Sequence, residues 1–250
     1  MTRCVTIIGL GPGDDQQITP AASQALASAT DVVGYITYVG RVAPRPGLTL
    51  HASDNRVEAE RACQALDLAA AGGNVVIVSS GDPGVFAMAA AVLEVLEADP
   101  ERWVDVDVSV LPGITAMLAA AARAGAPLGH DFCVINLSDN LKPWAVIEKR
   151  LKLAAEADFA MAFYNPRSKA RPKGFEKTLQ ILNRSCGDDR LVIFARAVFT
   201  AQEQIKVVPL SAATADMADM HTVVLVGSSQ TRLLSHKNRT FVYTPRAYED

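Results

Sequence analysis

The sequence lacks the closely spaced ligand sets that zinc and iron–sulfur sites need. Its four cysteines form no C-x-x-C pair, and its four histidines show no H-x-x-x-H spacing. Such ligands usually come in short-range pairs, so we expect no intrinsic metal site. The isolated cysteines are typical of small buried hydrophobic residues. They are Cys4, Cys63, Cys133 and Cys186.

Long apolar runs and a strong charge imbalance are also missing. No apolar run reaches the roughly 18–20 residues of a membrane span, so we expect no membrane segment. The net charge is −3, which gives no general affinity for nucleic acid. There is no repeat or low-complexity tract, and a strand signal directly after Met1–Cys4 leaves no room for a signal peptide. We therefore expect a cytoplasmic location.

Half of the 250 residues are apolar, and strand and helix signals alternate along the chain. This alternation predicts an α/β fold with two α/β domains, 1–124 and 125–250, and a cleft between them. The boundary is placed at the break Gly125–Gly129. The predicted strands are 5–10, 32–33, 75–79, 104–110, 132–136, 159–164, 191–195, 205–208 and 222–226. The predicted helices are 20–29, 56–71, 86–97, 115–124, 144–157 and 174–183.

Two glycine-rich turns follow β-branched apolar runs, at Gly9–Asp14 and at Ser80–Val85. Loops at the carboxyl ends of buried strands are where open α/β folds bind ligands, so the pair predicts a small-molecule site. The first turn partly fits the dinucleotide pattern G-x-G-x-x-G. However, Asp14 stands where a small residue is needed, and Pro12 removes a backbone donor. The sequence therefore disfavours NAD or FAD.

Four junctions follow strands in a fixed order: Pro12–Asp14, Gly81–Pro83, Pro112–Ala116 and Phe163–Pro166. Together they resemble the tetrapyrrole (corrin/porphyrin) methylase family, the class III methyltransferases that use S-adenosylmethionine. The resemblance runs over nearly the whole chain. Further segments are similar to the branch that methylates carbon 17 of precorrin-3B in cobalamin biosynthesis and contracts the ring to precorrin-4. These segments are Gly34–Tyr38, Leu137–Trp144, Tyr164–Ser168 and Thr244–Tyr248.

The resemblance implies S-adenosyl-L-methionine as methyl donor, S-adenosyl-L-homocysteine as product, and a homodimer. Alternatives stay open at single positions: Asp82 binds the ligand or caps the helix near Phe86, and Thr115 binds the methionine carboxylate or caps its own helix. His221 and Thr222 precede the last core strand and could touch adenine, but a purely structural role is favoured for both. The implied cofactor contacts are Pro12, Ser80, Gly81, Asp82, Val85, Thr115, Ala116, Asn165 and Ala197.

Ring contraction implies a base that removes a hydroxyl proton. Asp14 and Asp139 are the favoured candidates, with Tyr35 and His130 as alternatives. Some relatives carry an acidic residue where Ile36 stands, and that role is absent here. Asn136, Ser228 and Ala247 also depart from the branch's usual pattern.

The implied substrate carries many carboxylates, which guanidinium groups bind well. The predicted substrate contacts are Tyr35, Arg167, Lys169 and Arg171, with Arg232, Lys237 and Arg239 as a second cationic group. Three other functions stay open: a methyltransferase acting on cobalt-factor III, a nucleotide-binding dehydrogenase, and a non-catalytic tetrapyrrole-binding protein.

Overall fold

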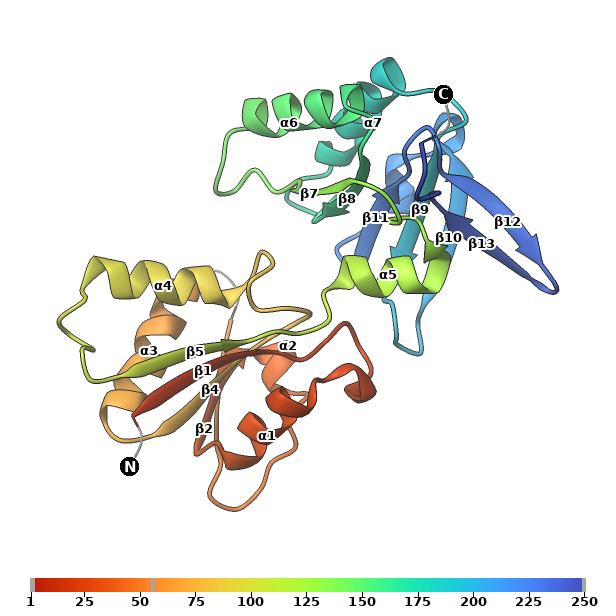
Figure 1. Cartoon of the computed structure of the whole chain (residues 1–250). Helices are drawn as coiled ribbons and strands as arrows, with labels where there is room; N and C mark the ends of the chain where they lie inside the picture. The colour runs from red at the N-terminus through yellow and green to blue at the C-terminus, as the bar shows by residue number, and fades with distance from the viewer. Residues whose placement is uncertain (1–2, 55–56, 249–250) are drawn as a thin grey trace. The chain divides into compact units, whose positions relative to one another are not determined.

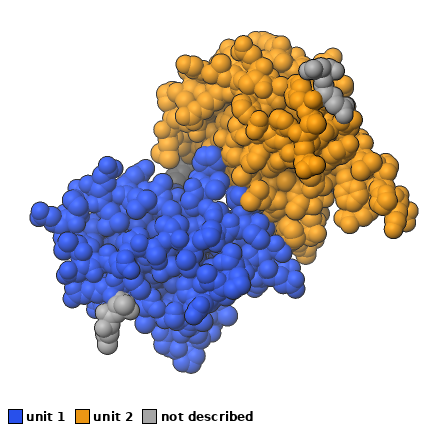
Figure 2. Space-filling model, viewed as in Figure 1, with its two compact units in different colours: residues 1–115 blue, residues 116–250 orange. Residues whose placement is uncertain are grey.

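The computed structural model divides the chain into two compact units, Met1–Thr115 and Ala116–Asp250, coloured blue and orange in Figure 2. It describes residues 3–54 and 57–248. The start of the chain and the predicted helix start at residue 56 therefore lie outside the described residues. The domain division after residue 124 stays a prediction. Among the described helices, none is both long and apolar enough to span a membrane.

Unit 1 is built on a five-stranded sheet in which all neighbouring strands are parallel, in the order β3-β2-β4-β1-β5 (Figure 1). The predicted strands are confirmed, except that the strand expected from Val104 begins only at Asp107. A turn in which Val106 N donates to Trp103 O precedes it. β3 was not predicted. The strands are β1 (Cys4–Gly9), β2 (Asp31–Tyr35), β3 (Thr49–Ser53), β4 (Asn74–Ser79) and β5 (Asp107–Leu111).

Helices cover both faces of this sheet (Figure 1). Val5 and Ile7 pack with α3 and α4 on one face, whereas Ile8 packs with α1 on the other. Because successive residues of a strand point to opposite faces, the central strands must be apolar throughout. Thr19 caps α1, and Pro20 starts it. The helices are α1 (Pro20–Ser28), α2 (Ile36–Val39), α3 (Glu58–Ala70) and α4 (Met88–Ala98), with the 3₁₀ helix η1 (Asp15–Gln17).

Unit 2 contains a mixed sheet in the order β10-β9-β11-β8-β7. Only β7 and β8 pair in parallel, and the other neighbours are antiparallel. The carboxyl ends of β7 and β8 therefore meet at one edge. All five strands were predicted. They are β7 (Phe132–Asn136), β8 (Ala160–Tyr164), β9 (Leu191–Arg196), β10 (Gln204–Pro209) and β11 (Thr222–Val226).

The core of unit 2 lies between this sheet and the helices α6 and α7, where Phe163, Phe175 and Phe194 are buried. A small separate sheet joins β6 (Gly125–Ala126) to a hairpin that projects from the rest of unit 2 (Figure 1). The hairpin strands are β12 (Arg232–His236) and β13 (Arg239–Tyr243). The helices are α5 (Ala116–Ala124), α6 (Trp144–Glu156) and α7 (Gly174–Ser185), with the 3₁₀ helices η2 (Leu210–Ala212) and η3 (Ala215–Met217).

Candidate active site

Three loops of unit 1 meet at the carboxyl ends of β1, β4 and β5, which are neighbours in the sheet. The first two loops are joined by their backbones. Gly11 N donates to Gly81 O at 3.2 Å, and Gly81 N donates to Gly11 O at 3.0 Å. Both glycines have positive φ, 67° and 62° respectively. The two glycine-rich turns singled out in the sequence therefore form one structure.

Glycine is required where these loops touch. A Cβ on Gly9 or on Gly113 would collide with the carbonyl oxygen of Gly81. Backbones approach this closely only where no side chain intervenes. The loop after β4 is therefore held between the ends of β1 and β5.

Asp82 fastens the same junction with its side chain. Its Oδ1 accepts from Gly84 N at 2.8 Å, and its Oδ2 accepts from Gly113 N at 2.8 Å. The alternative prediction, that Asp82 caps the following helix, is wrong. The N-cap residue of α4 is Ala87, and no side chain caps this helix. The helix starts too far along the chain from Asp82. The carboxylate therefore joins the loops that follow β4 and β5.

Asp14 and Arg41 act on the first loop. Asp14 is exposed, and its Oδ1 accepts from Gln16 N at 2.9 Å as the N-cap of η1. Arg41 donates through Nη2 to Leu10 O at 2.8 Å and through Nη1 to Gly11 O at 3.4 Å. Arg41 was not predicted as a site residue, because no local pattern in the sequence places a residue after α2 against the loop after β1.

A tyrosine pair lies beside the second loop. The rings of Tyr35 and Tyr38 meet edge to face, with centroids 5.4 Å apart. Burial raises the pKa of Tyr38, and Tyr35 adds to this; a hydrogen bond with Ser80 and the charges of Arg61 and Arg41 oppose the shift without reversing it. The phenol of Tyr38 therefore keeps its proton near neutral pH. Tyr38, which the sequence analysis did not assign to the site, contacts a predicted cofactor residue.

In unit 2, the loops after β7 and β8 are joined by side chains. Asn165, at φ 52°, donates through Nδ2 to Asn136 Oδ1 at 3.1 Å. Arg171 donates through Nη1 to Leu137 O and to Asn165 O, both at 3.4 Å, and its Nε lies 3.9 Å from Asp139 Oδ1. The Arg171 side chain is only 14% exposed. Its guanidinium thus holds two loops together, a role that the sequence did not predict.

The remaining predicted residues differ in exposure. Ala197 follows β9 at φ 47° and donates its N–H to His221 O at 2.9 Å. Gly81 and Thr115 are buried, whereas Asp14, Asp139 and Lys169 are exposed. The others are half-buried: Pro12, Tyr35, Ser80, Asp82, Val85, Ala116, Asn165, Arg167, Arg171 and Ala197.

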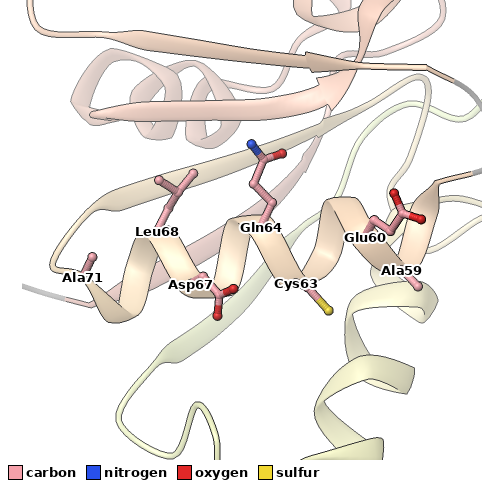
Figure 3. A pocket seen from close by; sticks show the side chains of 7 residues that line it. All are labelled: Ala59, Glu60, Cys63, Gln64, Asp67, Leu68 and Ala71. Carbon is pink, nitrogen blue, oxygen red and sulfur yellow. The ribbon is translucent and has the colours of Figure 1, made fainter.

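Two open hollows contain none of these predicted residues. Figure 3 shows the first, whose lining side chains all come from α3 and its end: Ala59, Glu60, Cys63, Gln64, Asp67, Leu68 and Ala71. The second is lined by Phe194, Arg196, Gln204, Lys206, Asp216, Met217, Ala218 and Asp219. No group of three or more His, Cys, Asp or Glu side chains in residues 3–54 and 57–248 could hold a metal ion.

Comparison with known proteins connects this geometry to a family. The family model "Tetrapyrrole (Corrin/Porphyrin) Methylases" matches residues 4–214. A precorrin-3B C(17)-methyltransferase of Sinorhizobium sp is 51% identical over 249 residues, which cover 99% of this chain and 98% of that protein. A probable cobalt-factor III C(17)-methyltransferase of Salmonella typhimurium is 39% identical, covering 98% of this chain and 99% of that protein.

A solved structure, that of the methyltransferase CobJ, is similar over nearly the full length. It has a TM-score of 0.93 and 62% sequence identity, and it covers 96% of this chain and 99% of its own. The resemblance stated from the four strand-end junctions is thereby confirmed. The chain belongs to the tetrapyrrole (corrin/porphyrin) methylase family.

Proposed function

We propose that this protein transfers a methyl group from S-adenosylmethionine to carbon 17 of precorrin-3B and contracts the ring. The observation that carries the proposal is the 51% identity to a precorrin-3B C(17)-methyltransferase over 98% of that protein. Methylation of cobalt-factor III is the second candidate activity. A probable cobalt-factor III C(17)-methyltransferase also matches this chain, at 39% identity over 99% of that protein. Family membership disfavours a dehydrogenase.

The cofactor contacts proposed in unit 1 lie in the loops after β1, β4 and β5. Ser79 Oγ, at the end of β4, is buried and has no hydrogen-bond partner among the described residues. A polar ligand beside Ser80 and Gly81 fits such an edge, because buried polar atoms are normally paired. When bound, S-adenosylmethionine supplies an electrophilic methyl group. The protein then needs mainly to align donor and acceptor, which can contribute about 7–11 kcal/mol.

The contacts proposed in unit 2, at Ala116, Asn165 and Ala197, rest on the family resemblance. Asn165 and Ala197 both have positive φ, which is uncommon for residues other than glycine. Such conformations often mark functional loops, and this supports the assignment. The predicted homodimer and cytoplasmic location stay predictions.

Asp14 and Asp139 remain the proposed bases for ring contraction. Asp14 carries an exposed carboxylate, and one of its oxygens accepts a hydrogen bond from Gln16 N. Asp139 is exposed too, but its carboxylate lies 3.9 Å from the Arg171 guanidinium. The Arg171 guanidinium therefore already engages the Asp139 carboxylate. We therefore rank Asp14 first.

Arg167, Lys169 and Arg171 remain the proposed contacts for the carboxylates of the substrate, and Arg171 is the most engaged of the three within the protein. Arg171 was predicted as a third contact, but its Nη1 already donates to two carbonyl oxygens. Lys169 is exposed and Arg167 is half-buried, and neither forms an ion pair within residues 3–54 and 57–248. Tyr35, at the end of β2, remains a proposed substrate contact.

The test is turnover with two substrates in parallel. The purified protein is incubated with S-adenosylmethionine and either precorrin-3B or cobalt-factor III, and the products are identified by mass spectrometry and absorbance. One added methyl group and a contracted ring from precorrin-3B support the proposal. Turnover of only the cobalt compound would assign the second candidate, and binding of either compound without methyl transfer would indicate a non-catalytic tetrapyrrole-binding protein.

A further inference from the structure

The turn after β9 contains two non-glycine residues in the left-handed region. Ala197 has φ 47° and Phe199 has φ 60°. A bulky side chain rarely adopts this conformation, and it persists only where the surroundings impose it. The contacts that hold this turn are therefore informative about its role.

The backbone of the turn is tied at both ends. Ala197 N donates to His221 O at 2.9 Å, and the hydroxyl of Thr200 donates to Ala197 O at 2.7 Å. Phe199 N donates to Glu203 Oε2 at 2.7 Å. The side chain of Glu203 thus reaches back across the turn to the second left-handed residue.

The same carboxylate oxygen binds a helix. Arg123, in the last turn of α5, donates through Nε to Glu203 Oε2 at 2.8 Å. Its guanidinium carbon also lies 3.9 Å from the centroid of the Phe199 ring. One oxygen and one aromatic ring therefore join α5 to the turn after β9.

Stability alone does not account for this arrangement. The side chains of Arg123 and Glu203 are 43% and 25% exposed, and ion pairs this exposed contribute little to folding. Here, however, the Glu203 carboxylate also accepts from the backbone of Phe199, which is in the left-handed region. It acts on the turn that carries Ala197 and on the helix that begins at Ala116, two of the proposed cofactor contacts.

We propose that Arg123 and Glu203 are positioning residues for the methyl donor. They hold the Ala197–Phe199 turn in its left-handed conformation and fix it relative to α5, so that the backbone at Ala197 meets S-adenosylmethionine without further ordering. This inference rests on the proposed function. Pre-formed binding loops gain affinity because they need less ordering when the ligand binds.

The test compares binding with turnover in Glu203→Ala and Glu203→Gln. Removing the carboxylate should raise the calorimetric Kd for S-adenosylhomocysteine, and the KM for S-adenosylmethionine, by about tenfold. The kcat at saturating donor should stay near the wild-type value. Glutamine keeps an oxygen for Phe199 N but loses the charge that pairs with Arg123, so its effect should be smaller.

The matched control is Glu148→Ala. Glu148 pairs with Lys152 at 2.7 Å on α6, also in unit 2, and neither residue touches the turn. This variant should bind S-adenosylhomocysteine as the wild type does. The effects of Arg123→Ala and Glu203→Ala should add less than fully in the double variant, because the two changes share the Arg123–Glu203 interaction. The double variant should still bind somewhat less tightly than Glu203→Ala alone, because it also loses the contact of Arg123 with the Phe199 ring.

Two outcomes separate the inference from the proposed function. If the wild type binds S-adenosylhomocysteine and Glu203→Ala binds it with the same Kd, the positioning role is wrong. If the wild type binds neither S-adenosylmethionine nor its product, the proposed function itself fails. If melting curves show that Glu203→Ala does not fold, the milder Glu203→Gln serves as the test. An unchanged Kd for S-adenosylhomocysteine in Glu203→Gln would then overturn the inference.

Discussion

The carboxylate of Asp82 accepts a hydrogen bond from the backbone N–H of Gly113 at 2.8 Å, across 31 residues of sequence. Its other oxygen accepts from Gly84 N within the same loop. One side chain therefore fixes the loop after β4 to the loop after β5. A residue predicted to contact the cofactor thus has a structural role whether or not it also touches the ligand.

Asp82→Ala should lower the stability of unit 1 as well as the affinity for S-adenosylmethionine. Loss of the two hydrogen bonds to a charged group should reduce the free energy of unfolding by about 1–3 kcal/mol. Asp82→Asn should cost less, because its amide oxygen can still accept from Gly84 N. Thermal unfolding and calorimetry measure the two effects separately.

The control for Asp82 is Asp105→Ala, which removes an exposed carboxylate 3.2 Å from Arg3. Such a pair contributes about 0–1 kcal/mol. If Asp82→Ala and Asp105→Ala had equal melting temperatures, Asp82 would not hold the loops.

Gly113→Ala should destabilise the protein more than an ordinary surface change. The added Cβ would collide with Gly81 O and lie 3.0 Å from Gly9 Cα, and overpacking of this kind costs about 1–3 kcal/mol. Gly174→Ala, at the first residue of α7, is the matched control. Its Cβ would lie 3.9 Å from its nearest neighbours, Pro166 O and the Trp144 ring, which is ordinary van der Waals contact. A melting curve for each variant should show a loss only for Gly113→Ala.

Asp14→Asn should slow ring contraction while leaving the fold intact. Asparagine is as good an N-cap as aspartate, so the turn at Gln16 is kept while the carboxylate base is lost. General-base catalysis typically contributes about 10²–10⁴-fold, so the contracted product should form more slowly by that order. Reactions with precorrin-3B, quenched at several times and analysed by mass spectrometry, give the rate of ring contraction.

The parallel variant Asp139→Asn distinguishes the two candidates. A contraction rate that falls in Asp139→Asn and not in Asp14→Asn would reverse their ranking. Equal rates in both variants and the wild type would remove both as the base.

The stability of unit 2 should depend on pH through Asp158. Burial raises the pKa of this carboxyl, but hydrogen bonds from Ser229 and Tyr248 and the charge of Arg190 outweigh it and hold the pKa below its usual value. A lowered pKa in the folded state stabilises the protein above the unfolded pKa of about 3.9 and loses that effect as the pH falls further.

Asp158→Asn tests this dependence without straining the chain. Asp158 has φ 56°, a conformation that asparagine tolerates well. The variant should be less stable near pH 7 by about 1–3 kcal/mol, and the difference should shrink below about pH 4. Denaturant unfolding at several pH values measures it; a constant difference between pH 7 and pH 3 would contradict the assignment.

The central strands were predictable because burial on both faces requires continuous β-branched residues, as in Val75–Val78. The hairpin β12–β13 was not predicted because its turn lacks the usual glycine. The left-handed position of this turn is occupied by Lys237, at φ 51°. The helix α2 was missed because Ile36–Val39 is β-branched and aromatic, which is more typical of a strand.

The candidate site was predictable where chemistry lies in one short segment, and not where distant segments meet. The glycines of the two turns carry their own signal. The contact of Arg41 with Leu10 O, and that of Arg123 with Glu203, join residues 31 and 80 positions apart. Such pairs depend on how the strands are ordered, which no local pattern records.

The backbone contacts among Gly9, Gly81 and Gly113 have a consequence for protein engineering. Substrate specificity in α/β enzymes is often altered by exchanging one loop between relatives. Here a foreign loop after β4 would have to reproduce the path of Gly81 between two neighbours that leave no room for a side chain. In a chimaeric protein, the segments after β1, β4 and β5 should therefore be exchanged together, all three from the same relative.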